Sequence, residues 1–338
     1  MTSPTPPGTR SVDRSRAGWF ACSILALAPS CRQVARDMTG DVAYASGGRV
    51  VLLDVDSGRE RVLVEDNGYD RPLVWLPDGR RLVHWNHAGG AWDLWSIDVE
   101  SGEHVNLTRS ADDSRSAVGS PDGRWIAWMK GGAGTWVMRS DGTGGHAVHD
   151  LGHRDAPPAW SPSSQRLVLT HLEDGSMSLH LVELADGTVT ATKELGRGEA
   201  VAFVDESRLL VLAYLGDTYD LVIVDVDSGE REPVTRNEAF EGAVALSPAR
   251  DRIAFVESDD SGSRLVALEL GNDETRVLAE VEGTYSPPSF SSDGEFLVYE
   301  SGPRGEMRVH AVRFDGGAVP IELTSAGATT PVWRPAAR

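Results

Sequence analysis

The stretch that decides the fold is "RPLVWLPDGRRLVHW", residues 71–85. A short apolar segment ends at Trp75, Leu-Pro-Asp-Gly follows, and a second apolar segment begins at once. Asp and Gly favour a tight turn here, because Asp caps the turn with its side chain and Gly adopts a positive φ without strain. The stretch therefore predicts a β-hairpin.

The same pattern recurs along the chain. Its anchors are residues 75, 119, 160, 203, 246, 290 and 333, which lie 41 to 44 residues apart. Clear copies are "GSPDGRWIAWM" at 119–129 and "FSSDGEFLVYE" at 290–300. Regularity at this period is typical of propeller blades. Each unit holds four strand-like segments, and the second of them is apolar without clean alternation, which indicates a sheet covered on both faces.

The two ends of the repeat complement each other. Residues 41–65 supply a second, third and fourth strand without a first, whereas "TTPVWRP" at 329–335 supplies a first strand alone. Pairing the two removes two exposed strand edges. The sequence therefore predicts an all-β fold over residues 41–335: a seven-bladed β-propeller of four-stranded antiparallel blades, in which the last strand closes the first blade.

The repeat resembles the WD40-like (PD40) propeller repeat of the TolB type, which also forms the propeller of prolyl-oligopeptidase-like peptidases. The resemblance is carried by Trp75 to Gly79, Ser120 to Gly123, Trp160 to Pro162, Ser247 with Pro248, and Phe290 to Gly294. It implies the fold but assigns no site residues. TolB itself places an α/β domain before a six-bladed propeller, and the peptidases carry a hydrolase domain; the repeats here match neither arrangement.

Composition restricts the partners. The chain has 338 residues and a formal net charge of −19, so its surface repels phosphates and nucleic acid is not an expected partner. An acidic surface favours a soluble monomer. Both cysteines, Cys22 and Cys31, precede residue 40, so the repeats have no disulfide and no thiolate metal site.

The amino-terminal residues predict export. Arg10, Arg14 and Arg16 precede the mostly apolar stretch "AGWFACSILALAPSC", which is too short to span a bilayer. We expect a signal peptide over 1–30 and a tether over 31–40, with Cys31 placed like the lipidated cysteine of a bacterial lipoprotein. A lipid anchor would then be the membrane attachment, in the periplasm or at the outer membrane. The alternative is a plain signal peptide cut near Ala28, which leaves a soluble periplasmic or secreted protein.

Motifs for catalysis are weak. A Gly-x-Ser-x-Gly elbow is absent. The stretch "HDLGH" at 149–153 differs from a zinc-protease helix in composition and in its loop position. "DVDSG" at 54–58 and 225–229, with "DVESG" at 98–102, is interpreted as the turn between third and fourth strands rather than as a calcium loop. We assign no catalytic residue, cofactor or metal from the sequence.

A ligand is expected at the end of the ring that carries the long variable loops, since variable loops on a rigid frame commonly bind. These loops include 86–92, 171–177, 193–200, 213–220, 236–242 and 257–263. The candidate ligand-face residues are Arg71, Arg115, Arg154, Asp155, Tyr219 and Tyr285. The alternative is that these side chains only solvate the channel mouth.

The first hypothesis for function is therefore a non-catalytic scaffold of the cell envelope that docks protein or peptide partners through its variable-loop face. An envelope hydrolase of the lactonase kind, with its site at the channel mouth, is the second. A binder of sugars or peptidoglycan fragments is the third. Almost no His, Asp or Glu occurs in the expected first strands, which favours docking over hydrolysis.

Overall fold

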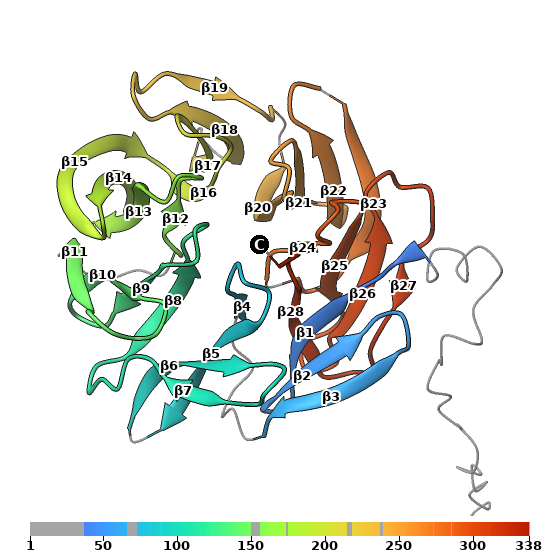
Figure 1. Cartoon of the computed structure of the whole chain (residues 1–338). Coiled ribbons are helices and arrows are strands. Elements are labelled where there is room, and N and C mark those ends of the chain that lie inside the picture. The colour runs from blue at the N-terminus through green and yellow to red at the C-terminus, as the bar shows by residue number, and fades with distance from the viewer. Residues whose placement is uncertain are drawn as a thin grey trace, which may run out of the picture.

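A computed structural model describes residues 37–65, 73–88, 90–149, 156–173, 175–214, 218–236, 239–272, 274–284 and 286–337. Within these residues the chain forms seven four-stranded antiparallel sheets. Figure 1 shows the sheets arranged as blades around one axis. The predicted seven-bladed propeller is confirmed. The described part of the chain contains no helix with the length and hydropathy that a membrane span requires.

We number blades 1 to 6 along the chain and call the closing blade 7. Blade 1 contains β4 (Val74–Trp75), β5 (Arg81–Ala88), β6 (Ala91–Asp98) and β7 (His104–Asn106). Blade 2 contains β8 (Ser114–Gly119), β9 (Trp125–Lys130), β10 (Gly134–Arg139) and β11 (His146–His149). Blade 3 contains β12 (Ala159–Trp160), β13 (Arg166–Glu173), β14 (Ser176–Ala185) and β15 (Thr188–Arg197).

The second half of the ring repeats this order. Blade 4 contains β16 (Glu199–Phe203), β17 (Arg208–Tyr214), β18 (Tyr219–Asp225) and β19 (Arg231–Pro233). Blade 5 contains β20 (Phe240–Leu246), β21 (Arg252–Asp259), β22 (Gly262–Glu269) and β23 (Thr275–Val281). Blade 6 contains β24 (Ser289–Phe290), β25 (Phe296–Ser301), β26 (Arg308–Arg313) and β27 (Ile321–Glu322).

Blade 7 joins the two ends of the repeat. It contains β28 (Ala328–Trp333), β1 (Asp41–Ser46), β2 (Arg49–Asp54) and β3 (Arg59–Val64). Strand β28 pairs antiparallel with β1, with Val42 opposite Trp333 and Ser46 opposite Ala328. The expected closure by the carboxyl-terminal strand is therefore confirmed.

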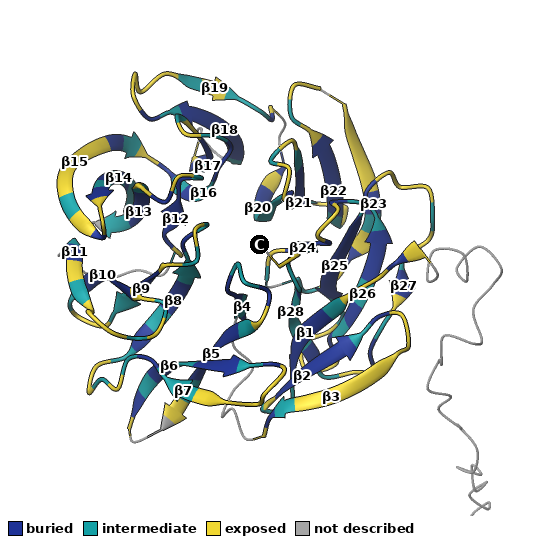
Figure 2. Cartoon of the chain, in the orientation of Figure 1, coloured by how far each residue is buried: buried dark blue, intermediate teal, exposed yellow. Residues whose placement is uncertain are grey.

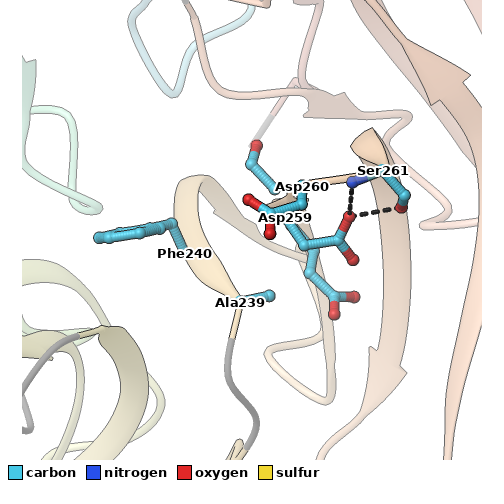
Figure 3. A pocket seen from close by; sticks show the side chains of 7 residues that line it. Ala239, Phe240, Asp259, Asp260 and Ser261 are labelled. Atoms are coloured by element: carbon cyan, nitrogen blue, oxygen red, sulfur yellow. Dashed lines mark hydrogen bonds between the residues drawn. The ribbon is translucent and has the colours of Figure 1, made fainter.

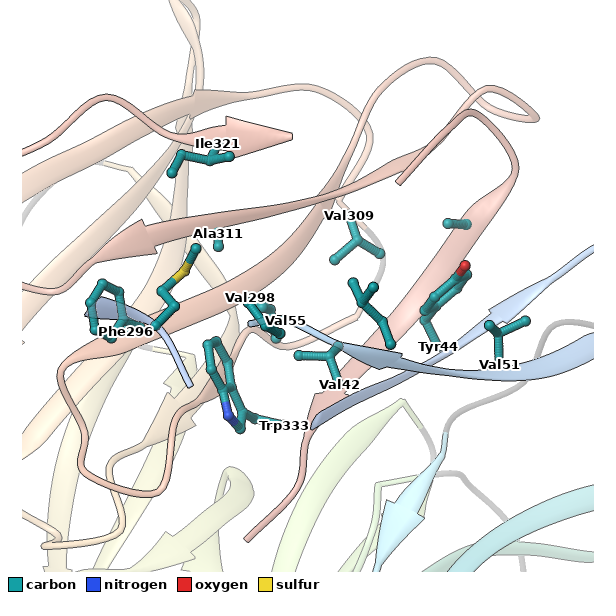
Figure 4. Close-up of a cluster of buried hydrophobic side chains, with 13 residues drawn as sticks. Val42, Tyr44, Val51, Val55, Phe296, Val298, Val309, Ala311, Ile321 and Trp333 are labelled. Atoms are coloured by element: carbon teal, nitrogen blue, oxygen red, sulfur yellow. The ribbon is translucent and has the colours of Figure 1, made fainter. Parts of the chain in front are cut away.

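The core lies between blades rather than inside any one of them. Seven clusters of buried apolar side chains each combine residues of two neighbouring blades. Figure 4 shows the cluster between blades 7 and 6, where Val42 and Trp333 face Phe296 and Val298. Figure 2 shows exposure concentrated on outer strands such as β3 and β15. The lack of alternation in the inner strands follows, because both faces of each sheet are covered.

The anchor tryptophans belong to this core, as the sequence predicts. Trp75, Trp160 and Trp333 expose at most 9% of their surface. The indole Nε1 of Trp160 also donates to the backbone oxygen of Val118 in the preceding blade, 3.4 Å away. Each anchor therefore fills the space between blades, and Trp160 ties two of them together.

One tight turn recurs where the first strand meets the second. The hydroxyl oxygen of a buried Ser accepts a hydrogen bond from the backbone N–H five residues later, at 2.9 to 3.1 Å. The four serines are Ser120, Ser161, Ser247 and Ser291. Ser164 and Arg250, with φ of 63° and 64°, stand where other copies have Gly. Contacts to a neighbouring blade accompany this strain: the Asp122 N–H donates to Ser164, and Arg250 donates to the Phe203 carbonyl.

A second repeated contact ends the fourth strand. The hydroxyl oxygens of Thr108 and Thr324 accept from the backbone N–H of Leu94 and Val309 in the third strand, both at 3.0 Å. Thr235 accepts from Leu221 in the same way at 2.8 Å. In each case a side chain continues the ladder where the fourth strand's own backbone has turned away.

The prediction of a long loop is wrong at four positions. Strands occupy most of residues 86–92, 171–177, 193–200 and 257–263. Only one or two residues separate the two strands at each position, which are β5 and β6, β13 and β14, β15 and β16, and β21 and β22. The pairing of His87 with Trp92 shows the reason: the backbone ladder continues to the end of the sheet although the hairpin consists of polar and small residues such as Asn86, His87 and Ala88. The fourth strand β15, with ten residues, is longer than the fourth strands of the other blades.

The acidic turns agree with their structural interpretation. Asp54, Asp98 and Asp225 lie at the end of a third strand and accept backbone N–H groups of the turn that follows. Hydrogen bonding from the backbone of Ser101 is the largest cause that lowers the pKa of Asp98, to about 2. These carboxylates are used as turn caps, in the pattern of an Asx turn.

Candidate functional site

The end of the ring that carries the second-to-third-strand hairpins and the connections between blades is called the loop face here. Of the candidate residues, the structure describes Arg115 and Tyr219. Arg71, Arg154, Asp155 and Tyr285 lie outside the described residues, as do Cys31 and all of "HDLGH" except His149. Arg115 is in blade 2 and Tyr219 in blade 4, so blade 3 separates them and the structure does not bring them together.

Arg115 lines a pocket of about 300 Å³ with Asp113 and Lys130. Its guanidinium Nη2 lies 2.7 Å from a carboxylate oxygen of Asp113. The other oxygen of Asp113 accepts the backbone N–H of Trp92 in blade 1, at 3.1 Å, and this bond is the largest cause that lowers the pKa of Asp113. The pair therefore joins two blades, which limits how freely Arg115 can turn to a ligand.

Tyr219 begins the third strand of blade 4 and pairs with Tyr214 at the end of the second. Their ring centroids are 5.2 Å apart and the rings are tilted by 52°. Tyr214 is 59% exposed. Two aromatic rings side by side at the rim are suited to contact with a partner, because they offer apolar area together with a polar hydroxyl.

One pocket on this face lies in blade 5 (Figure 3) and has a volume of about 650 Å³. Ala239 and Phe240, at the start of β20, form one side, and the hairpin between β21 and β22 forms the other. Phe240 is 53% exposed. In Figure 3 its ring points away from the hairpin that carries Asp259, Asp260 and Ser261.

The hairpin side of the pocket is acidic. Asp259 accepts the backbone N–H of Ser261 at 2.7 Å and also its hydroxyl, and it pairs with Arg264 at 2.6 Å. The hydroxyl of Ser261 is the main cause that lowers the pKa of Asp259, so the carboxylate is charged at neutral pH. Arg264 also lies 3.5 Å from Glu257. One guanidinium thus faces two lining carboxylates, which leaves the pocket negative with Asp260 beside it.

Sequence reasoning missed Phe240 and Tyr214. Both occur inside loops expected to vary, 236–242 and 213–220, but nothing in the sequence distinguishes an apolar residue exposed at the rim from one buried between blades. The register supplies that distinction, because each is the first or last residue of its strand. Among the described residues, no three His, Cys, Asp or Glu side chains are grouped so that they could hold a metal ion.

Comparison with known proteins places the fold. A TolB homolog from Chlorobium luteolum is 26% identical over 161 residues, which are 47% of this chain and 37% of that relative. The structure of TolB from Acinetobacter baumannii superposes with a TM-score of 0.59 at 18% identity, over 93% of this chain and 87% of that one. The chain is a β-propeller that is similar to TolB. The sequence match spans little more than a third of its curated relative.

Other solved propellers resemble this TolB-like chain as closely in shape. A puromycin-hydrolyzing peptidase from Mycobacterium tuberculosis gives a TM-score of 0.68 at 15% identity, over 86% of this chain and 54% of the peptidase. An oligogalacturonate lyase in complex with manganese gives 0.65 at 12% identity, over 85% and 86% of the two chains. No protein-family model matches the chain. At these identities the likeness concerns the fold alone.

Proposed function

We propose that this TolB-like propeller is a non-catalytic scaffold of the cell envelope that docks a protein or peptide on its loop face. The proposal rests on the exposure of Phe240, whose side chain is 53% exposed beside an acidic pocket. Exposed aromatic residues on a rigid frame are typical anchors of protein interfaces. The proposal places the chain outside the cytoplasm through the signal expected over 1–30, held at a membrane by Cys31.

The charge of the pocket favours a partner of opposite sign. Glu257, Asp259 and Asp260 surround it, and the whole chain carries −19. A partner segment that places an apolar side chain on Phe240 and a Lys or Arg beside it would match both features. Electrostatic complementarity of this kind mainly speeds association and weakens with salt.

Affinity capture with a matched pair of variants tests the proposal. Wild type, Phe240→Ser and Val319→Ser are used to capture proteins from envelope extracts; Val319, in blade 6 and 69% exposed, is the control for loss of an exposed apolar side chain. We expect a partner that wild type and Val319→Ser retain, that Phe240→Ser loses, and that high salt releases. Identical captures by all three proteins would reject docking at this pocket.

Membrane attachment is tested separately. Cys31→Ala should move the protein from the membrane fraction to the soluble fraction if Cys31 is lipidated, since acyl chains provide the attachment. An unchanged distribution would reject lipidation and leave docking untouched.

A hydrolase is the second candidate, on account of Glu199. This residue begins β16, the first strand of blade 4, and burial raises the pKa of its carboxyl group. A carboxyl group with a raised pKa is a common general acid. Activity assays with esterase and lactonase substrates distinguish the two candidates. If wild type hydrolyses a substrate and Glu199→Gln does not, the protein is a hydrolase and the scaffold proposal is rejected.

A further inference from the structure

A third pocket, of about 450 Å³, lies between blades 1 and 2, away from Phe240 in blade 5. Its walls include Leu107, which follows the last strand of blade 1, and Ser114, Trp128, Lys130, Trp136 and Met138 of blade 2. This volume lies in the range of small-molecule sites, about 300–1,000 Å³. The residues that form it were not singled out by the sequence.

The register of blade 2 explains how these side chains meet. Ser114 is opposite Lys130 in the β8–β9 pair, and Trp128 is opposite Trp136 in the β9–β10 pair. Directly opposed residues project to the same face of a sheet, and so do residues two apart in one strand, such as Trp128 and Lys130. All four therefore face blade 1, and all four line the pocket beside the apolar cluster that the two blades share.

Two polar atoms in this wall have no partner in the described part of the chain: the hydroxyl oxygen of Ser114 and the indole Nε1 of Trp128. Ser114 is 0% exposed and Trp128 is 4% exposed. Trp136 is different, because its Nε1 donates to the Ala133 carbonyl at 3.0 Å. A buried donor without an acceptor is costly, so an unpartnered indole and hydroxyl beside a cavity point to a ligand that completes them.

The remaining polar groups identify the ligand's chemistry. Lys130 Nζ lies 4.4 Å from the centre of the Trp136 ring and 3.5 Å from an Asp112 carboxylate oxygen. The lining thus combines donors (Trp128, Lys130, Arg109), an acceptor (Asp112) and hydroxyls that can be either (Ser114, Ser110). A purely anionic or cationic ligand would satisfy only part of this set. A sugar ring matches it, since its hydroxyls donate and accept while its C–H face packs against tryptophan.

We propose that the pocket between blades 1 and 2 binds a sugar of one or two rings, with the Trp128 indole and the Ser114 hydroxyl hydrogen-bonded to its oxygens. The site is independent of docking at Phe240, so either can exist without the other. Strands β8, β9 and β10 of blade 2 supply Ser114 and the two tryptophans, and the connection from blade 1 supplies further polar residues within 108–112.

The test measures the binding of glucose, N-acetylglucosamine and N,N′-diacetylchitobiose to the whole chain. Binding is measured by tryptophan fluorescence and by isothermal titration calorimetry. Trp128→Phe and Ser114→Ala each remove one hydrogen-bonding atom. Trp95→Phe is the matched control, because Trp95 Nε1 also lacks a partner among the described residues and Trp95 is not among the residues that line this pocket. We expect saturable binding of at least one sugar, weakened about 3- to 10-fold by each pocket variant and unchanged in the control.

A fold defect would not explain that outcome. Ser114→Ala removes only a buried polar atom that has no partner and should leave the melting temperature unchanged or raise it, so weaker binding with undiminished stability assigns the effect to the ligand contact. Trp128→Phe also removes buried ring atoms from the core and is expected to lower the melting temperature. Tighter binding of the disaccharide than of its single ring would indicate the end of a glycan chain. The absence of saturable binding by every sugar up to tens of millimolar, or equal affinities in all four proteins, would overturn the proposal.

Discussion

The indole Nε1 of Trp75 donates a hydrogen bond to the backbone oxygen of Val332, 3.2 Å away and 257 positions later in the chain. This bond crosses the seam at which the ring closes. Arg334 lies over the same indole, with its guanidinium carbon 5.6 Å from the ring centre. It also pairs with the Asp41 carboxylate at 2.7 Å and donates to the Gly79 carbonyl. One arginine therefore fastens β28 to β1 and to the first turn of blade 1.

Arg334→Ala should destabilise the protein by about 2 kcal/mol, because it removes charge-assisted hydrogen bonds from a partly buried site. Arg80→Ala serves as the comparison. Arg80 pairs with Asp98 on the same end of blade 1, but its side chain is 54% exposed, so its loss should destabilise the protein much less than the loss of Arg334. Urea denaturation of the three proteins measures the difference; equal midpoints for the two variants would contradict the role given to Arg334.

Removing β28 should have a much larger effect. A chain that ends at Ala328 leaves β1 without its inner neighbour and exposes the cluster between blades 7 and 6. We expect that the shortened chain no longer unfolds in a single cooperative transition. Circular dichroism during heating measures this. A chain that ends at Ala336 retains β28 and should unfold like the wild type. Cooperative unfolding of the shorter chain would show that the ring does not depend on this strand.

Each threonine that ends a fourth strand should contribute measurably to the free energy of unfolding. Thr108→Val and Thr324→Val keep the shape of the side chain but leave the N–H groups of Leu94 and Val309 without the hydroxyl, at an expected cost of about 1–3 kcal/mol. Thr190→Val, on the exposed strand β15, is the control and should change stability by less than about 0.5 kcal/mol. Chemical denaturation measures the free energy of unfolding of the three variants. An equally large loss of stability in Thr190→Val would show that the hydrogen bond to the third strand is not the cause.

Stability should decrease in mild acid because of His84. This histidine, 1% exposed in β5, has a pKa lowered to about 4, chiefly by burial and secondarily by the nearby His104. The unfolded chain takes up the proton near pH 6.5 and the folded chain only near pH 4, so stability falls between these values, by about 3 kcal/mol at most. Urea midpoints from pH 7 to pH 4 measure the fall. His84→Leu should flatten that range; an unchanged slope would exclude His84 as its cause.

Glu199 should act in the opposite pH direction. Burial raises the pKa of its carboxyl group in the folded state, so the folded chain holds this proton more tightly than the unfolded chain does. The protonated group is accommodated in acid, and the ionised group lowers stability as pH rises past the range where the unfolded glutamate titrates. Glu199→Gln should therefore be more stable than wild type at pH 7, with the difference shrinking towards pH 4. A difference that does not vary with pH would indicate packing rather than charge.

The fold could be predicted because its information is local and repeated. Pro-Asp-Gly fixes a hairpin within four residues, and the period of the anchors then fixes the number of blades. The wrong loops have the same origin: at 86–91 the residues become polar or small while the backbone ladder continues to Ala88 and Ala91, and apolar patterning does not record backbone pairing.

The candidate sites could be predicted only in part. Thr108, Thr235 and Thr324 are visible as the ends of "NLT", "PVT" and "ELT", but their role depends on which third-strand N–H lies opposite them. The pocket between blades 1 and 2 depends on the distance between two sheets, as does the burial of Trp128. Such properties are set by packing between repeats rather than by the pattern within one repeat.

The position of β28 orders the events of synthesis. The sheet made of β1, β2 and β3 leaves the ribosome first, yet its inner neighbour, Ala328–Trp333, is translated after every other blade. Until then the earliest blade presents an unpaired edge and an uncovered apolar face, the combination that promotes misassociation of nascent chains. A chaperone that holds the growing chain would therefore be most needed by its oldest segment, and translation speed near the end of the message would set how long that segment waits.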